Sequence, residues 1–159
     1  MSCNRPAAAA FAVLLAMPTM VLAQSKDTRF GPVSVSQNTL LFRGKPVVPS
    51  VVGEAGLVLD QVLQVGSYDA VVVENLLGGN GCPAMFYVVS VTAQGATASP
   101  AFGTCSESAD VSRKGDGVSL AMPTISTLAQ QRAGKGNAGQ MHVFVVTNGA
   151  VTDNGRPVR

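Results

Sequence analysis

Short runs of alternating apolar and polar residues, separated by turn sequences about every ten residues, constrain the fold of this chain more than any other feature. Period-two alternation between closely spaced turns is typical of antiparallel strands. Residues 124–133 lose the alternation and show helical spacing, which predicts a short helix or an irregular loop there. Because no long helices alternate with the strands, parallel α/β folds are excluded. The pattern predicts an all-β fold: a small antiparallel β-sandwich or partly open barrel with at most one short helix.

The run from Ala84 to Thr92 is the strongest strand signal. Apolar residues occupy every second position from Met85, and Phe86 and Val88 add apolar side chains at the other parity. A strand that is apolar on both faces is typical of the centre of a layered structure. Gly95 then turns the chain, so the segment 96–102 is predicted to return as the antiparallel hairpin partner.

Further strands are predicted over residues 33–36, 39–42, 57–65, 68–77, 118–122 and 141–147. In the run 57–65 the apolar residues stand mostly at odd positions, which predicts one apolar face, and Gln61 breaks the pattern once. The two prolines of the segment 46–49 restrict it to a sheet edge. The sequence of residues 154–158 resembles that of residues 43–47, and we interpret this likeness as convergent hairpin chemistry and not as a repeat.

Residues 1–23 have the layout of a secretory signal peptide. Arg5 supplies a basic start, residues 7–16 are apolar, and Pro18 precedes the sequence Val21-Leu22-Ala23, which suits signal peptidase. The competing interpretation is an uncleaved membrane anchor, for which the apolar segment is of marginal length. We therefore expect cleavage after residue 23.

The expected mature protein is a single β-domain over residues 24–159. This segment of 136 residues is long enough for one hydrophobic core. It contains no further apolar run of membrane-spanning length, so no membrane span is expected after cleavage. The expected location is the periplasm or the outside of the cell.

Two cysteines remain in the mature chain, because Cys3 lies within the signal. Cys82 follows a glycine-rich turn and Cys105 follows the predicted return strand, so antiparallel pairing would bring them together. We expect one disulfide, which stabilises the fold by roughly 3 kcal/mol through loop-closure entropy. A redox pair would usually read Cys-x-x-Cys, and a zinc site would have His142 as its only other strong ligand, so both alternatives are weaker.

Charge and aromatic content exclude several classes of partner. Once Arg5 is removed, ten Lys and Arg remain against nine Asp and Glu, so the domain has no electrostatic attraction to nucleic acid or anionic lipid. The chain has no Trp, six Phe and two Tyr, which argues against a sugar-binding surface of stacked aromatic rings.

No residue is predicted to be catalytic, to bind a cofactor or to ligate a metal. No Gly-x-Ser-x-Gly turn marks a nucleophile, and the carboxylates show no paired spacing. The turn at residues 78–81 lacks the Lys and Ser or Thr of a phosphate loop. His142, the only histidine, shares its strand face with Phe144 and Val146, so a structural histidine is the simplest interpretation.

The sequence therefore favours a non-enzymatic binding or interaction module whose partner is an unidentified protein or envelope component. The expected interaction surface is the loop region pinned by the disulfide, with residues Gly79, Asn80, Gly81, Pro83 and Thr104. The alternative is a hydrolase with a cryptic site near His142. A deep polar pocket holding His142 beside a carboxylate and a hydroxyl would support that alternative, and burial of His142 among apolar side chains would exclude it.

Overall fold

The computed structural model describes residues 24–79, 81–125 and 139–158. The predicted signal peptide, Asn80 and residues 126–133 of the predicted short helix lie outside the described residues. The described chain is all-β, with three antiparallel sheets, which confirms the predicted fold class. The described residues form no helix, so none of them belongs to a helix that could cross a membrane.

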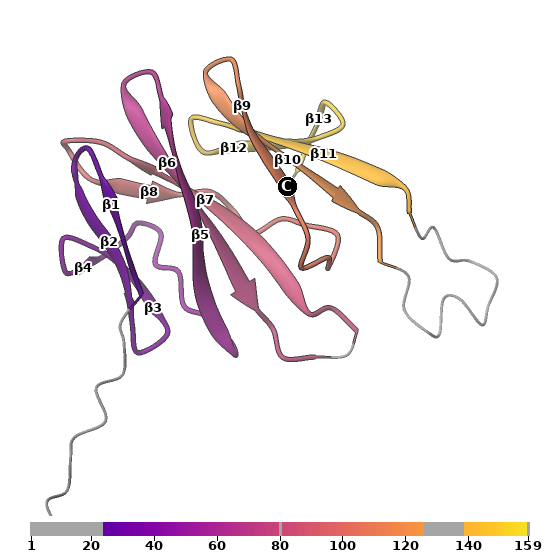
Figure 1. Cartoon of the computed structure of the whole chain (residues 1–159), viewed down its shortest axis with the longest axis horizontal. Coiled ribbons are helices and arrows are strands. Elements are labelled where there is room, and N and C mark those ends of the chain that lie inside the picture. Colours follow the sequence, from indigo (N-terminus) through magenta and orange to yellow (C-terminus); the bar gives the residue numbers. More distant parts are fainter. Residues whose placement is uncertain (1–23, 80, 126–138, 159) are drawn as a thin grey trace, which may run out of the picture.

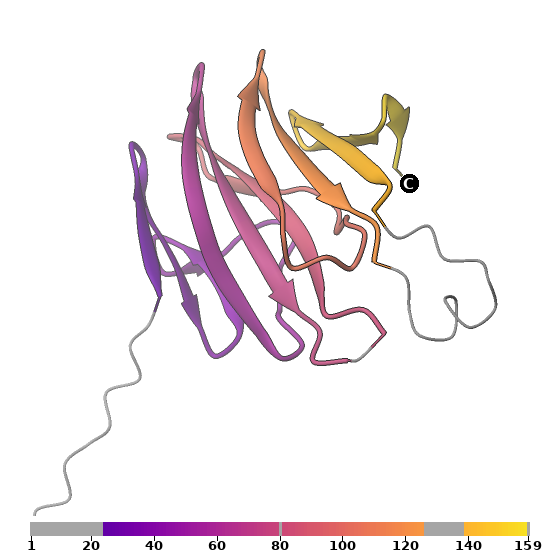
Figure 2. The same cartoon turned by 45° about the vertical axis from the view of Figure 1, so that its right-hand side comes forward.

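The three sheets stack as a sandwich, with one sheet in the middle (Figures 1 and 2). The N-terminal sheet contains β1 (Ser25–Thr28), β2 (Gly31–Ser36), β3 (Thr39–Phe42) and β4 (Lys45–Pro46). The central sheet contains β5 (Gly56–Val65), β6 (Tyr68–Leu76), β7 (Ala84–Val91) and β8 (Ala96–Ala98). The C-terminal sheet contains β9 (Asp110–Lys114), β10 (Gly117–Pro123), β11 (Met141–Thr147), β12 (Ala150–Asp153) and β13 (Arg156–Pro157).

Two hydrophobic cores lie on the two faces of the central sheet. The first core joins it to the N-terminal sheet and includes Val33, Leu40, Phe42, Val71, Val73 and Val89. The second core joins it to the C-terminal sheet and includes Val72, Phe86, Val88, Leu120, Phe144 and Val146. Strands β6 and β7 therefore carry apolar side chains at both parities, since a side chain on either face is taken out of water.

The prediction of one apolar face over residues 57–65 was wrong. Leu59 packs in the first core, whereas Val65 packs in the second. The register with β6 shifts between Leu59 and Gln61, so a β-bulge moves the later odd-numbered side chains to the opposite face. Because both faces of this sheet are buried, apolar residues suit either parity, and the sequence pattern does not reveal the switch.

Two polar contacts at the start of β6 tie it to the outer sheets. The Arg29 side chain, in the β1–β2 turn, donates from Nε to Oδ1 of Asp69 at 2.7 Å. The Tyr68 hydroxyl donates to the main-chain oxygen of Asp116, in the β9–β10 turn, at 2.9 Å. Burial raises the pKa of Tyr68, and the Asp116 carboxylate raises it further, so the phenol stays protonated as the donor.

The Cys82–Cys105 disulfide joins the entry of β7 to the end of its returning partner, as predicted. The Cα atoms of the two cysteines are 4.6 Å apart. The return begins as β8 and meets β7 again at Phe102, which exchanges main-chain hydrogen bonds of 2.7 and 3.0 Å with Phe86. The disulfide therefore closes the open end of an antiparallel hairpin.

The same three-strand meander occurs at both ends of the chain, as β2–β3–β4 and as β11–β12–β13. The pairs Val33–Phe42, Val35–Leu40 and Leu41–Pro46 correspond in register to Phe144–Asp153, Val146–Val151 and Thr152–Pro157. Each meander also ends with a main-chain bond, from Val47 to Leu40 and from Val158 to Val151. The likeness of residues 43–47 to 154–158 is thus part of a structural correspondence over three strands.

Candidate functional site

A pocket of about 370 Å³ opens beside the disulfide, against the C-terminal sheet, and we call it the disulfide-end pocket. Its lining residues are Met85, Ala101, Phe102, Gly103, Thr104, Thr124, His142, Phe144, Asp153 and Val158. The pocket brings Thr104 of the predicted interaction loop together with His142 of the hydrolase alternative. Thr104 and His142 are distant along the chain, so the sequence did not predict that they would line the same pocket.

His142 and Asp153 form a polar pair across strands β11 and β12. The Nδ1 atom of His142 lies 2.8 Å from Oδ2 of Asp153, and the imidazole stacks on Phe144 with ring centroids 6.1 Å apart. The two side chains are 25% and 30% exposed, so His142 is not buried among apolar groups. An ionised carboxylate can only accept, so Nδ1 is the donor in this pair, and Nε2 is the ring nitrogen that this pair leaves unused.

Two buried oxygen atoms on residues that line the disulfide-end pocket have no hydrogen-bond partner. They are Oγ1 of Thr124 and Oδ1 of Asp153, and no other buried side-chain nitrogen or oxygen of the described residues is without a partner. A buried polar atom without a partner is unfavourable by about 1–3 kcal/mol. Their occurrence in one pocket indicates a place where a hydrogen-bonding group from outside is accommodated.

The first meander shows what the fold requires at the position of Asp153. There the corresponding residue is Phe42, which is 7% exposed and packs in the first core. An aromatic residue therefore suits this position of the first meander, so the meander as such does not require a carboxylate there. A polar residue at a place that favours an apolar one is a mark of a functional site.

The predicted interaction loop lies only partly at the pocket. Thr104 lines it, and its hydroxyl donates to the main-chain oxygen of Pro123 at 2.6 Å, which holds the loop against β10. Gly79 and Gly81 are exposed, Pro83 is half-buried, and none of the three lines the pocket. The disulfide connects this loop to the segment that carries Thr104.

A separate acidic hollow of about 530 Å³ gathers Asp60, Glu74, Glu107 and Asp110. Sequence analysis found no pairing among these carboxylates, because they come from different strands and a loop. Burial raises the pKa of Glu74 above its ordinary value of 4.5, and Glu107 and Asp60 raise it further. In the described part of the chain, no three His, Cys, Asp or Glu side chains are placed to hold a metal ion.

The substitution Glu74→Gln is expected to stabilise the fold at neutral pH. With its raised pKa, Glu74 binds a proton more tightly in the folded than in the unfolded chain, so the free energy of unfolding falls as the pH rises through the carboxyl range. The variant should gain about 0.5 kcal/mol at neutral pH, since solvent screens partly exposed charges. It should gain nothing at about pH 3, where the carboxyl is protonated in both states.

Thermal denaturation of wild type and variant at the two pH values measures this gain. The exposed Glu54 provides the matched control, because Glu54→Gln removes the same charge away from the acidic hollow. An equal gain at both pH values, or an equal gain from the control, would contradict repulsion within the hollow.

No protein-family model matches the chain, and no match to it is found among the curated proteins or the solved structures. The disulfide is compatible with an oxidising compartment outside the cytoplasm.

Proposed function

We propose that the protein is an exported, non-enzymatic binding domain that recognises its partner at the disulfide-end pocket. The observation that carries this proposal is the pair of unpartnered buried oxygens on Thr124 and Asp153 in one pocket. The proposed domain spans residues 24–159 and acts in the periplasm or outside the cell, after removal of residues 1–23. Its proposed partner is a protein or an envelope component.

The lining of the pocket favours a group that is apolar along its length and ends in a hydrogen-bond donor. Met85, Phe102 and Phe144 supply apolar walls, while Oδ1 of Asp153 is a buried acceptor without a partner, which a ligand would reach only by displacing the side chains that cover it. A hydroxyl or amine is the complement of a carboxylate oxygen, and an amine would also gain from its charge. On a protein partner, a lysine or tyrosine side chain has this chemistry.

Benzylamine, benzyl alcohol and toluene test this proposal, because they share an aromatic body and differ in the donor. We expect the amine and the alcohol to shift the amide resonances of Thr104, Thr124 and His142 saturably in an NMR titration, and toluene to bind more weakly. Asp153→Asn should weaken benzylamine binding about tenfold through loss of a charge-assisted hydrogen bond. Asp27→Asn, on exposed β1, removes the same charge elsewhere and should leave the affinity unchanged.

Two results would contradict the proposal. One is the absence of saturable shifts at the pocket with all three compounds at about 10 mM, a concentration that detects even millimolar affinity. The other is equal weakening of benzylamine binding by Asp153→Asn and Asp27→Asn, since this would reflect net charge alone.

A hydrolase is the second candidate, favoured by the 2.8 Å contact between His142 and Asp153 in a pocket that also holds the Thr124 hydroxyl. Among the described residues, however, no hydroxyl or thiol forms a hydrogen bond with His142, and both cysteines of the mature chain are joined in the disulfide. Within residues 24–79, 81–125 and 139–158, therefore, no nucleophile is paired with His142. Turnover of p-nitrophenyl acetate that disappears in both His142→Ala and Asp153→Asn would favour the hydrolase over the binding domain.

A further inference from the structure

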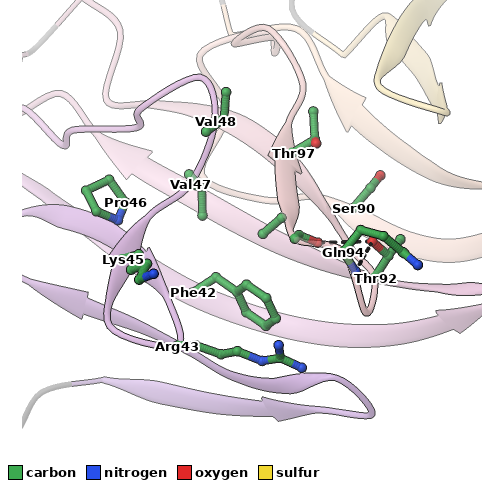
Figure 3. Close-up of a pocket in the computed structure, with 12 residues that line it drawn as sticks. Phe42, Arg43, Lys45, Pro46, Val47, Val48, Ser90, Thr92, Gln94 and Thr97 are labelled. Carbon is green, nitrogen blue, oxygen red and sulfur yellow. Dashed lines mark hydrogen bonds between the residues drawn. The ribbon is translucent and has the colours of Figure 1, made fainter.

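A third cavity, of about 570 Å³, lies between the β3–β4 turn and the β7–β8 hairpin (Figure 3), and we call it the hairpin groove. It shares no lining residue with the disulfide-end pocket. Arg43 and Lys45 line it, and no carboxylate does. The groove is therefore positively charged, in contrast to the acidic hollow.

The side chain of Arg43 is held in place by two contacts and by the space that a glycine leaves. Its Nε atom donates to the main-chain oxygen of Phe30 at 2.7 Å, and its guanidinium carbon lies 4.9 Å from the centre of the Phe42 ring. The absence of a side chain at Gly31 leaves room for it, because a Cβ there would lie 2.9 Å from Nε. An arginine fixed in this way loses little conformational freedom when it binds a ligand.

The charges of the groove are not neutralised within the described chain. The ion pairs of the described residues are Arg29–Asp69 and His142–Asp153, and neither includes Arg43 or Lys45. Arg43 uses only Nε for a hydrogen bond to a described residue, so its terminal Nη groups keep their donors for a ligand.

The backbone at Arg43 shows that the turn itself does not favour arginine. Its φ is 49°, in the left-handed region, where asparagine and glycine are preferred. At the corresponding position of the second meander stands Asn154, with a φ of 47°. The second meander thus uses the residue that suits the turn, whereas the first carries an arginine at some local cost, and strain of this kind is concentrated at functional positions.

We propose that the hairpin groove binds a small ligand that carries a carboxylate, phosphate or sulfate group. The planar Arg43 guanidinium offers paired donors that match two oxygens of such a group, and Lys45 adds a second positive charge. Phe42, Thr92 and Gln94 provide an apolar surface and polar contacts for the rest of the ligand. Figure 3 shows the Phe42 ring and the Arg43 side chain extending side by side toward the hairpin that carries Thr92 and Gln94.

Arg43→Asn is the decisive variant, because it installs the residue that the second meander already uses. We expect its melting temperature to stay close to that of the wild type, since the readier backbone conformation of asparagine offsets the lost contacts of Arg43 with Phe30 and Phe42. Its affinity for the anion should fall at least about tenfold through loss of a charge-assisted, two-point contact. Lys45→Gln, which leaves the turn residue unchanged, should weaken binding as well.

The measurement is an NMR titration at low salt with inorganic phosphate, inorganic sulfate and glucuronate, with glucose as the neutral counterpart of glucuronate. We expect saturable shifts in residues 42–45 and 92–95 with at least one anion and none with glucose. The anion that binds most tightly then identifies the preferred group. Lys114→Asn on exposed β9 is the charge-matched control and should leave the affinity unchanged.

The proposal is overturned by any of three results. The first is the absence of saturable shifts with every anion at about 10 mM. The second is unchanged binding in both Arg43→Asn and Lys45→Gln. The third is equal weakening by Lys114→Asn, because general attraction to net charge would then explain the binding.

Discussion

Replacing Arg29 with alanine is expected to lower the free energy of unfolding by about 3 kcal/mol, because it leaves the buried carboxylate of Asp69 without its counter-charge. Asp69 is 1% exposed and accepts from both Nε and the main-chain N–H of Arg29, at 2.7 and 2.6 Å. Arg29 also donates to the main-chain oxygen of Tyr68 at 2.7 Å. The expected loss is at the lower end for a broken buried ion pair, since Arg29 is 38% exposed and water can partly replace it.

Urea denaturation of Arg29→Ala and of Arg113→Ala measures this effect against a matched control, because Arg113 is exposed on β9 and belongs to no ion pair of the described residues. Adding Asp69→Asn to the Arg29→Ala chain should restore part of the stability, since a neutral amide is less costly to bury than a charge. A loss below about 1 kcal/mol, typical of an exposed ion pair, would show that Asp69 does not depend on Arg29.

Removing the disulfide, by Cys82→Ala with Cys105→Ala, is the second large effect that we expect. The bond joins residues separated by 23 positions, and releasing a loop of that size lowers the free energy of unfolding by about 3 kcal/mol. For a domain of this length the melting temperature should fall by about 10 °C. Thermal denaturation followed by circular dichroism measures the change.

Reduction of the wild type is the matched control for this variant, because it opens the same bond without changing a residue. The reduced wild type and the double variant should melt at the same temperature. If both melted within about 2 °C of the oxidised protein, the Phe86–Phe102 pairing alone would hold this end of the hairpin. The loop-closure account of the disulfide would then be wrong.

The pairing of Cys82 with Cys105 was predictable because it depends on local information. A strong strand, a glycine turn and a returning strand form a hairpin, and the outer ends of a hairpin lie side by side independently of how the rest of the chain folds. The bulge in β5 was not predictable, since it depends on which face of the central sheet each outer sheet covers. The pattern of apolar residues is the same for either face.

The polar groups of the disulfide-end pocket and the hairpin groove were likewise only partly predictable from the sequence. His142 was noticed as the only histidine, but nothing in the sequence pointed to Asp153 as its partner, although the two are close along the chain. They meet because β12 folds back on β11 with Phe144 opposite Asp153. The role proposed for Arg43 was hidden in the same way, since a cation in a turn is usually only solvated, and the comparison with Asn154 requires the register of both meanders.

By itself, the sequence determined the all-β class, most strand positions, the turns and the disulfide. Each of these depends on the period of apolar residues or on the backbone preferences of Gly, Asn and Pro, which act over a few neighbouring residues. The tertiary structure alone decided the stacking of three sheets, the Arg29–Asp69 pair, the disulfide-end pocket and the hairpin groove. These features join side chains that are distant along the chain or lie on different strands, so their distances and burial exist only once the sheets pack.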